Sequence, residues 1–359
     1  MFDKKNSDGS SVRLNFVGDI SLNGRYINMY KDDINPFETI QDEFKEADYI
    51  VANLESFVNG ENGENSLKAP RLTATLDSLN YLKIIGIDVA CLANNHVYDH
   101  LESGFTKTVN FLENNGIRRL GAAKSKKDAS KPLILEKNSI KIGLLNYVTR
   151  DTNPNLPEYA DIKLNYFDLE KVISDIIKLK PKVNHVVLQL HWGGRVEGGS
   201  YPDINQPQIS KQLIDHGADL IIGHHSHTFQ PIEDYKGKYV FYSLGNFCFS
   251  DYWFEGKYYA LPERRKVTGI VGIDFNKTDY KVNLKFYKNE ITHFKKVKTY
   301  PIAKLNYIQK NILCYKLLWN IYYLNYKTLL PLTLFLKRKD LTVSDKVKRI
   351  VKGVLKRVN

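Results

Sequence analysis

Short apolar runs alternate with longer segments of helical periodicity from the start of the chain to about residue 250. The run "VRLNFVGDI" predicts a strand that ends at Asp19, and "DEFKEADYIVANLES" predicts a helix and then a strand that ends near Glu55. The segments "TLDSLNYLKIIGIDVACLANNH" and "QISKQLIDHGADLIIGHHSH" repeat the order of helix, glycine, strand and polar loop. This alternation is typical of α/β proteins, so we predict an α/β fold.

The pattern changes after Tyr239. The segments "VTGIVGIDFN" and "YKVNLKFYKN" alternate apolar and polar positions between turn residues, which is typical of antiparallel strands, and "HFKKVKTYPI" predicts an edge strand. From about Asn306 the pattern becomes helical and basic. We therefore predict a domain over residues 11–300 and a helical tail over residues 301–359.

Side chains that can bind metal follow several of the predicted strands at the point where each strand ends. In α/β sheets, the carboxyl ends of the strands are where ligand sites form. Carboxylate, amide and imidazole groups together suit one or two divalent ions such as Mn, Fe or Zn, which activate water and bind phosphoryl oxygens. The residues concerned are Asp19, Asn53, Glu55, Asn95, His96, His191, His224, His225 and His227.

Each of these residues has a simpler explanation when it is considered alone. Asp19 would cap a turn or a helix, Asn95 and His96 would stabilise a turn, and His191 beside Trp192 would be a core histidine. The whole set favours a metal site, because independent turns would not repeatedly place a ligand-type residue after a strand. Structural roles remain the better interpretation for His100, His185, His216 and His293.

Six sequence blocks, in order, resemble the CapA family, whose members are named for capsule and poly-γ-glutamate biosynthesis. The blocks are "FVGDISLNG", "VANLES", "LANNHVYDH", "LHWGGRVEGGSYPD", "DHGADLIIGHHSHTFQPIE" and "VFYSLGNF", and they cover roughly Leu14 to Phe249. The CapA family is in turn similar to calcineurin-like metallophosphoesterases. The resemblance therefore implies an α/β fold built as a β-sandwich flanked by helices, here with a C-terminal helical extension.

The resemblance also implies roles for single residues. It implies that His96, beside the metal ligand Asn95, faces the leaving group as a general acid. Arg71 or Arg195 would hold an anionic group, and Asn53 and Asn246 would contact the substrate, although for Asn246 a structural role beside the Gly245 turn is the better interpretation. The implied metal ligands are Asp19, Glu55, Asn95, His191, His225 and His227, the implied catalytic residues are His96, Asp19 and Asn95, and His224 and Asp99 would be extra ligands or would support the ligands.

Two positions depart from the phosphoesterase pattern. Ser21 stands where the Asp-x-His motif has its histidine, and Asn53 with Glu55 replaces a bridging aspartate. One metal position is therefore poorer in strong ligands, and the number of ions stays open. The same departure favours a second hypothesis, in which the protein is a non-catalytic accessory subunit that keeps the fold and binds polymer or partner enzymes.

The charge is concentrated in the tail. The 359 residues carry a net charge of +12, and residues 301–359 alone hold thirteen Lys or Arg and two Asp. The remainder is close to neutral, which argues against a nucleic-acid groove. Near the end of the tail, Val343, Val347 and Ile350 share a helical face, so we predict a basic amphipathic helix on an anionic membrane surface. The alternative is a helix that packs on the domain with its lysines in water.

The sequence has no apolar N-terminal segment that would serve as a signal peptide, and Lys316, Lys327 and Pro331 interrupt the apolar stretch over residues 312–336. We therefore expect a cytoplasmic protein, at the inner face of the membrane near polymer-synthesis machinery if the tail binds lipid. The leading hypothesis is a metal-dependent hydrolase that acts on a phosphoester or amide-like bond. Its substrate would be an anionic polymer, namely a capsular polysaccharide, an exopolysaccharide or poly-γ-glutamate, or another phosphoester.

Overall fold

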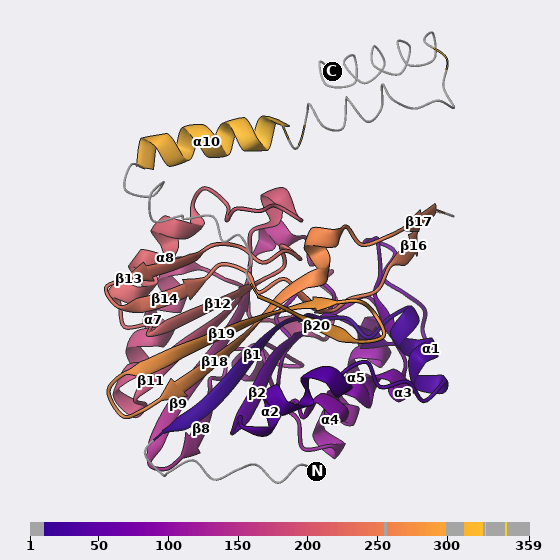
Figure 1. The fold of residues 1–359 in the computed structure, drawn as a ribbon, viewed down its shortest axis with the longest axis horizontal. Coiled ribbons are helices and arrows are strands. Elements are labelled where there is room, and N and C mark those ends of the chain that lie inside the picture. Colours follow the sequence, from indigo (N-terminus) through magenta and orange to yellow (C-terminus); the bar gives the residue numbers. More distant parts are fainter. Residues whose placement is uncertain (1–10, 255–256, 299–311, 326, 328–341, 343–359) are drawn as a thin grey trace. The chain divides into compact units, whose positions relative to one another are not determined.

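The computed structural model describes residues 11–254, 257–298, 312–325, 327 and 342 (Figure 1). The chain divides into two compact units, Met1–Asn306 and Tyr307–Asn359. In the second unit, the helix α10 (Ile312–Leu324) stacks the ring of Trp319 on that of Tyr323, with 5.0 Å between the ring centroids. The predicted amphipathic helix near the end of the tail lies outside the described residues.

The first large sheet has a parallel centre and an antiparallel flank. Its strand order is β20-β19-β18-β1-β2-β5-β6, and the short strand β15 also pairs with β1. Strands β1, β2, β5 and β6 run parallel, while β18, β19 and β20 add antiparallel neighbours, as the alternating segments after Tyr239 predict. The strands are β1 (Val12–Ile20), β2 (Tyr49–Leu54), β5 (Val89–Cys91), β6 (Arg118–Leu120), β15 (Asn246–Cys248), β18 (Val267–Phe275), β19 (Tyr280–Asn289) and β20 (Phe294–Val297).

The second large sheet has the order β13-β14-β12-β11-β9-β8. Its four central strands are parallel, and an antiparallel strand lies at each edge. The strands are β8 (Leu133–Lys137), β9 (Ile140–Val148), β11 (His185–His191), β12 (Leu220–His224), β13 (Ile232–Tyr235) and β14 (Lys238–Phe241). Smaller pairs are β3 (Phe57–Val58) with β4 (Thr73–Ala74), β7 (Ala122–Ala123) with β10 (Lys163–Leu164), and β16 (Tyr252–Phe254) with β17 (Lys257–Tyr259).

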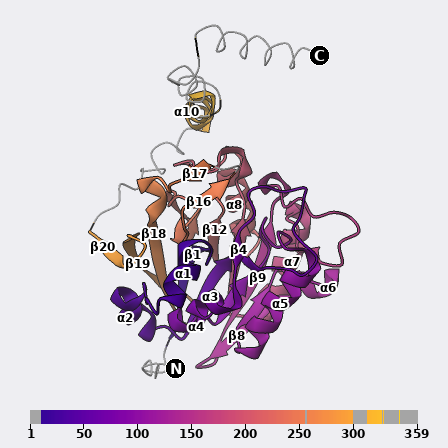
Figure 2. The same ribbon diagram turned by 90° about the vertical axis from the view of Figure 1, so that its right-hand side faces the viewer.

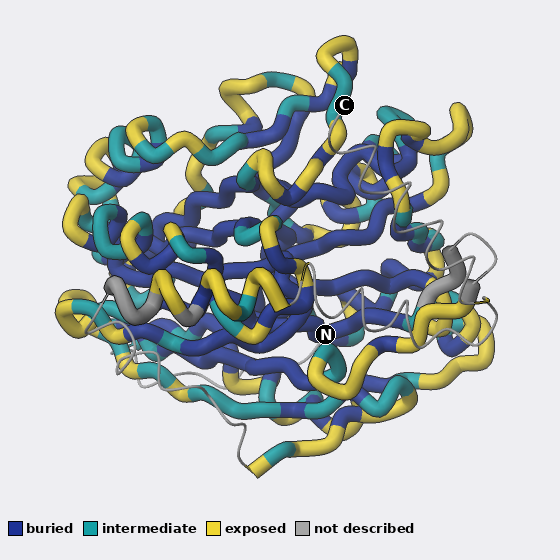
Figure 3. Tube along the Cα trace, turned by 90° about the horizontal axis from the view of Figure 1, so that it is seen from above, coloured by how far each residue is buried: buried dark blue, intermediate teal, exposed yellow. Residues whose placement is uncertain are grey.

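An apolar core between the two large sheets holds the sandwich together. Phe16 and Val51 from the first sheet are buried with Leu144, Val187 and Ile222 from the second, and the buried strands run through the middle of Figure 3. Removing this apolar surface from water is the main favourable contribution to folding. The α/β fold predicted from the sequence is therefore confirmed.

Helices cover the outer faces of the sandwich (Figure 2). A second apolar cluster packs Tyr81 and Phe105, from the helices before and after β5, on the outer face of the first sheet. On the second sheet, the side chain of Leu179 in α7 fills the space above Gly143 in β9. The helices are α1 (Arg25–Lys31), α2 (Gln41–Lys45), α3 (Leu76–Leu79), α4 (Tyr81–Ile85), α5 (Leu101–Asn114), α6 (Lys126–Ala129), α7 (Leu169–Leu179) and α8 (Gln206–Asp215).

The end of β1 is held by a close approach of two glycines. The N–H of Asp19 donates to the carbonyl of Gly245 over 2.9 Å, in the turn that leads into β15. A Cβ on Gly18 would lie 2.0 Å from that same carbonyl oxygen, so no larger residue fits there. Gly245 itself has a φ of 72°, which glycine adopts at little cost. This contact fixes the backbone that carries Asp19.

Within the part of the chain that the structure describes, none of the helices has the length and apolar character needed to cross a membrane.

Candidate metal centre

The carboxyl ends of strands from both large sheets meet at one place. In the first sheet Asp19 lies opposite Asn53, and in the second sheet His191 lies opposite His224. Hydrogen bonds then join the sheets, because His224 Nδ1 lies 3.0 Å from Asp19 Oδ1 and Asn53 Nδ2 lies 3.3 Å from His191 Nδ1. The residues predicted from strand ends thus gather across two sheets rather than along one.

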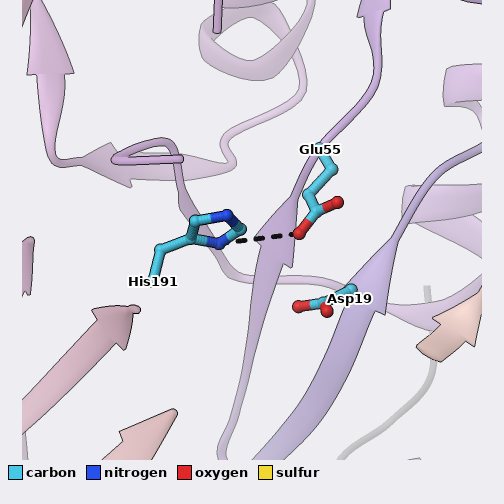
Figure 4. A group of neighbouring side chains, drawn as sticks. All are labelled: Asp19, Glu55 and His191. Carbon is cyan, nitrogen blue, oxygen red and sulfur yellow. Dashed lines mark ion pairs between the residues drawn. The ribbon is translucent and has the colours of Figure 1, made fainter. Parts of the chain in front are cut away.

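Asp19, Glu55 and His191 form the centre of this group (Figure 4), and each offers a ligand atom within 4.8 Å of the others. All three are fully buried, and Glu55 Oε1 lies 3.5 Å from His191 Nδ1. The amide of Asn53 donates over 2.9 Å both to Asp19 Oδ1 and to Glu55 Oε1. Two carboxylates and an imidazole held this way form a group that could bind a divalent metal ion.

The remaining predicted ligands surround this centre. Asn95 Oδ1 lies 2.9 Å from His191 Nε2, and His227 Nδ1 lies 3.4 Å from Asp19 Oδ2. The backbone N–H of His225 donates to Asp19 Oδ2 over 3.2 Å. His225 and His227 have φ values of 90° and 57°, a backbone region that residues other than glycine rarely adopt. Such conformations cluster at functional sites, where the surrounding structure holds them.

Unpaired polar atoms at this centre fit a metal ion. At this centre, three buried atoms have no hydrogen-bond partner among the described residues, namely Asn53 Oδ1, Glu55 Oε2 and His225 Nδ1. Leaving a buried acceptor without a partner costs about 1–3 kcal/mol, so such atoms call for a physical explanation. All three are oxygen or nitrogen atoms of the kind that bind divalent metals through a lone pair. The donor set therefore fits a divalent ion.

The two central carboxylates have opposite pKa shifts. Burial opposes ionisation of Asp19, but hydrogen bonds from His224 and His227 hold its pKa well below the usual value. Burial and the charge of Asp19 raise the pKa of Glu55 well above its usual value. Two neighbouring carboxylates in a dry site ionise together only when positive charge compensates them, and a divalent cation supplies such charge.

The imidazoles of the centre also have opposite pKa shifts. Burial places the pKa of His191 well below its usual value and lowers the pKa of His225 to about 4. Both rings are therefore neutral at pH 7, which is the form that binds metals. Burial also opposes protonation of His227, but the carboxylates of Glu55 and Asp19 raise its pKa to about 9.

Three predicted residues support the centre through hydrogen bonds to its side chains. His224 uses both ring nitrogens, one on Asp19 and the other 3.1 Å from Gln189 Oε1, so it positions Asp19. Asn246 Oδ1 lies 2.8 Å from His227 Nδ1, and its amide donates to the carbonyl of Arg265. Asn53 orients the carboxylates as described above. Buried hydrogen-bonded neighbours of this kind fix the geometry of metal ligands.

Ser21 offers no ligand in place of the missing histidine. Its hydroxyl is buried and donates to Asn23 Oδ1 over 3.0 Å. The position that holds an imidazole in the Asp-x-His motif is therefore occupied here by a short hydrogen-bonded side chain.

A pocket of about 380 Å³ opens beside the centre, and Asn95, His96 and His227 contribute to its lining. His96 Nδ1 lies 2.6 Å from Asp99 Oδ2, and Asp99 also accepts the N–H of Leu72 over 2.8 Å. With Nδ1 held by this carboxylate, Nε2 is the ring nitrogen that remains for the pocket. The pair therefore has the arrangement of an oriented acid–base histidine.

The cations of the pocket are not those predicted from the sequence. Arg71 bonds Glu64 and two backbone carbonyls, and the side chain of Arg195 is exposed; neither lines the pocket. Lys68 and Arg265 line it instead. The Lys68 ammonium is buried, donates to the carbonyl of Asn95 and lies 3.8 Å from Asp99, and burial lowers its pKa to about 8. Lys68 comes from a loop and Arg265 from the short 3-10 helix Glu263–Lys266, and neither segment has a hydrophobic periodicity that would single them out.

The fold is similar to that of a solved protein that was assigned as a nucleotidase. A Staphylococcus aureus protein assigned as a 5'-nucleotidase, solved in complex with α-ketoglutarate, superposes with a TM-score of 0.50 at 12% identity, covering 84% of this chain and 58% of that one. At this identity the likeness concerns the fold alone, and it confirms the helix-flanked sandwich that the sequence motifs implied.

The chain belongs to the bacterial capsule synthesis protein PGA_cap family, whose model matches residues 13–251. A PGA biosynthesis protein CapA of Bacillus subtilis is 31% identical over 253 residues, which are 69% of this chain and 66% of that protein. A capsule biosynthesis protein CapA of Bacillus anthracis is 29% identical over 275 residues, 72% of this chain and 65% of that protein. The matches thus span just under two thirds of these relatives, and the family expected from the six blocks is confirmed.

Proposed function

We propose that the protein is a metal-dependent hydrolase in the synthesis or processing of an anionic cell-envelope polymer. The observation that carries this proposal is the buried cluster of Asp19, Glu55 and His191, with unpaired ligand atoms around it and a polar pocket beside it. Membership in the capsule synthesis family and the CapA relatives support the polymer as the substrate class. The candidate polymers are capsular polysaccharide, exopolysaccharide and poly-γ-glutamate.

The proposed metal ligands supply carboxylate, amide and imidazole donors for one or two ions of Mn, Fe or Zn. When bound, the metal lowers the pKa of a coordinated water and polarises the phosphoryl or carbonyl oxygen of the substrate. Asn53 and His224 hold Asp19 in place through the hydrogen bonds described above. The proposed ligands are Asp19, Glu55, Asn95, His191, His225 and His227.

The chain's own residues supply the remaining chemistry. His96, held through Nδ1 by Asp99, presents Nε2 to the pocket and transfers a proton to the leaving group as a general acid. Burial and the charge of Lys68 lower the pKa of His96, and the carboxylate of Asp99 opposes this shift by stabilising the protonated ring. Lys68 and Arg265 bind an anionic group of the substrate, because both line the pocket and both are cationic.

The accessory role is the second candidate, and Ser21 is the observation that favours it. The hydroxyl of Ser21 is engaged with Asn23, so one metal position lacks the imidazole that phosphoesterases use. An accessory protein would keep the sandwich and the pocket, and it would bind polymer or a polymer-synthesis enzyme without turnover.

Metal analysis of protein purified without chelator tests the proposal. His191→Ala removes a donor from the centre, so we expect the metal content to fall strongly with only a small change in melting temperature. The matched control is His216→Ala, because His216 is exposed in the C-terminal turn of α8 and should leave the metal content unchanged. If His191→Ala unfolds the protein while the control does not, and the wild type carries no metal, His191 is a structural core residue.

Turnover separates the two candidate functions. The metal-loaded protein is assayed on a panel of phosphoesters and γ-glutamyl peptides. Hydrolysis that requires the metal and His96 supports the enzyme. A fully folded, metal-free protein that binds polymer but hydrolyses nothing supports the accessory subunit.

A further inference from the structure

We call the pocket beside the metal centre the metal pocket. A second hollow of about 740 Å³ lies outside it and is lined by basic and apolar side chains. It is formed by the helix α6, the segment that begins with Arg150, the short strand β10 and the start of α7. Five of its lining residues are cations, and two are carboxylates. The cations are Lys126, Lys127, Arg150, Lys163 and Lys171, and the carboxylates are Glu158 and Asp168. We call this hollow the basic groove.

The basic groove shares a wall with the metal pocket. The segment 150–157 lines both, because Thr152, Asn153 and Asn155 belong to the pocket, whereas Arg150 and Leu156 belong to the groove. Asn155 and Leu156 are consecutive, so their Cα atoms lie about 3.8 Å apart. The segment 150–157 is therefore the border between the pocket and the groove.

Most of the positive charge in the groove is available to a ligand. Lys126 and Lys127 are exposed, and no ion pair is found for them within the described residues; Lys163 also has none there, but its ammonium donates to the carbonyl of Ala160 over 2.6 Å. Lys171 is paired with Asp175 at 2.8 Å, and the carboxylate of Asp168 accepts the N–H of Lys171 as the N-cap of α7. The groove is therefore predominantly basic in a domain that is close to neutral overall, so the charge is local.

The apolar part of the lining narrows the choice of ligand. Leu156 and Pro157 are half-buried and provide aliphatic surface between the cations, whereas the side chains of Ile162 and Leu164 are buried and add little to it. The guanidinium of Arg150 lies 4.0 Å from the centroid of the Tyr166 ring and covers that face of it. This face is therefore not free to stack on a sugar ring. Aliphatic surface bordered by ammonium groups instead fits methylene-linked carboxylates.

We propose that the basic groove is a second binding site, which holds the continuing chain of a polycarboxylate polymer while one of its units occupies the metal pocket. This inference rests on the proposed polymer substrate, but it concerns binding outside the reacting centre. Binding energy from such a remote part of a substrate positions the reacting unit and favours long chains over short ones.

Fluorescence anisotropy with a labelled γ-glutamyl decamer tests the groove in the full-length protein. Lys126→Glu with Lys127→Glu reverses two charges on α6, which makes no part of the metal centre. We expect the Kd for the decamer to rise about tenfold or more, equivalent to about 1.4 kcal/mol, because each reversal turns attraction into repulsion. Lys126→Gln with Lys127→Gln should give a smaller rise in the same direction.

The matched control reverses two exposed lysines at the turn between β18 and β19 and at the start of β19, Lys277→Glu with Lys281→Glu. This pair changes the net charge equally, and it lies where β18 and β19 pair beside the start of β1, far from Asp19. We expect the control to keep the wild-type Kd, and a labelled γ-glutamyl dimer to bind both variants like the wild type. An unchanged Kd in the α6 variant, an equal loss in the control, or full displacement of the decamer by an acidic polysaccharide or duplex DNA of equal charge overturns the proposal.

The same samples distinguish this inference from the proposed function. Metal content and metal-dependent hydrolysis of a small phosphoester should be equal in the α6 variant and the wild type. If the wild type holds no metal and hydrolyses nothing, but the α6 variant still loses the decamer, the groove is real and the hydrolase proposal fails. If hydrolysis is present and the Kd for the decamer is the same in the α6 variant and the wild type, the hydrolase proposal is supported and the groove proposal fails.

Discussion

Among single residues, we expect the hydrogen-bonded pair of His96 and Asp99 to have the largest effect on kcat. The Asp99 carboxylate holds His96 Nδ1 at 2.6 Å and also accepts the N–H of Leu72. Asp99→Asn keeps the size of the side chain but loses the charge that stabilises a protonated imidazole. If His96 is the general acid, we expect kcat to fall by about 10²-fold or more. KM for a small phosphoester and the metal content should change little.

The variant Asp99→Glu shows whether the charge or the shape of the Asp99 side chain determines kcat. Asp99→Glu restores a carboxylate within reach of His96, so we expect partial recovery of kcat. Asp161→Asn is the control, because Asp161 is exposed and its loss should leave kcat unchanged. Loss of metal or a large fall in melting temperature in Asp99→Asn, without recovery in Asp99→Glu, would mean that Asp99 is only structural.

At the same scale, the sequence identifies residues at strand ends and in the loops that directly follow them, but not residues that follow no predicted strand. Asp19 and His191 are recognisable because each ends an apolar run, and the structure brings them together. Lys68 and Arg265 carry no such pattern, although they line the pocket. Their burial depends on side chains that are distant in the sequence, such as Asp99 for Lys68 and Glu197 for Arg265. The arginines that the sequence suggested, Arg71 and Arg195, lie elsewhere.

At the scale of elements, the carboxylate of Asp219 ties the start of β12 to its neighbours. It accepts the N–H of Val186 at 2.9 Å and pairs with Lys180 and Lys238. Burial opposes ionisation, but the hydrogen bonds from the two lysines lower the pKa of Asp219. Because the folded pKa lies below the unfolded value of about 3.9, the stabilisation is present above that pH and is lost as the pH falls through the folded pKa.

Asp219→Asn should therefore destabilise the protein in a pH-dependent way. We expect the free energy of unfolding to fall by about 1–3 kcal/mol at pH 7, since a buried hydrogen-bonded charge is removed. The difference from the wild type should shrink below about pH 4, where the wild-type carboxylate also becomes protonated. Urea unfolding at several pH values measures it. A difference that is constant with pH would mean that packing, not charge, explains the effect.

The order of elements was predictable, but their assignment to sheets was not. Helix and strand periodicities predict β1, β2, β5, β11 and β12, yet a period does not say that β11 and β12 belong to a second sheet. The parallel pairing of β15 with β1 depends on the approach of Gly18 and Gly245, which are distant in the sequence. The family resemblance supplied the sandwich that local patterns alone could not.

At the scale of the whole molecule, the basic tail suggests where the protein works. Residues 301–359 hold thirteen Lys or Arg and two Asp, while the chain as a whole has a net charge of +12. In α10, the apolar side chains of Leu317, Ile321 and Leu324 are exposed at 62%, 56% and 55%, and their spacing places them on one face of the helix. Apolar exposure next to concentrated positive charge is typical of a segment that binds an anionic bilayer surface.

We therefore propose that the tail binds the cytoplasmic leaflet and holds the enzyme beside polymer-synthesis machinery. Co-sedimentation with vesicles containing anionic lipid tests this, because each Lys or Arg near such a surface contributes about 1 kcal/mol. Full-length protein should sediment with anionic vesicles at low salt and should be released at about 0.5 M salt, where the Debye length is only a few ångströms. Truncation after Tyr300 should abolish binding to the vesicles. A full-length variant in which five tail cations are changed to Gln should also fail to sediment with them. Equal partitioning of all three proteins, on anionic or neutral vesicles, would show that the tail has no such role and that its lysines are only solvated. The five changed positions are Lys346, Lys348, Arg349, Lys352 and Lys356.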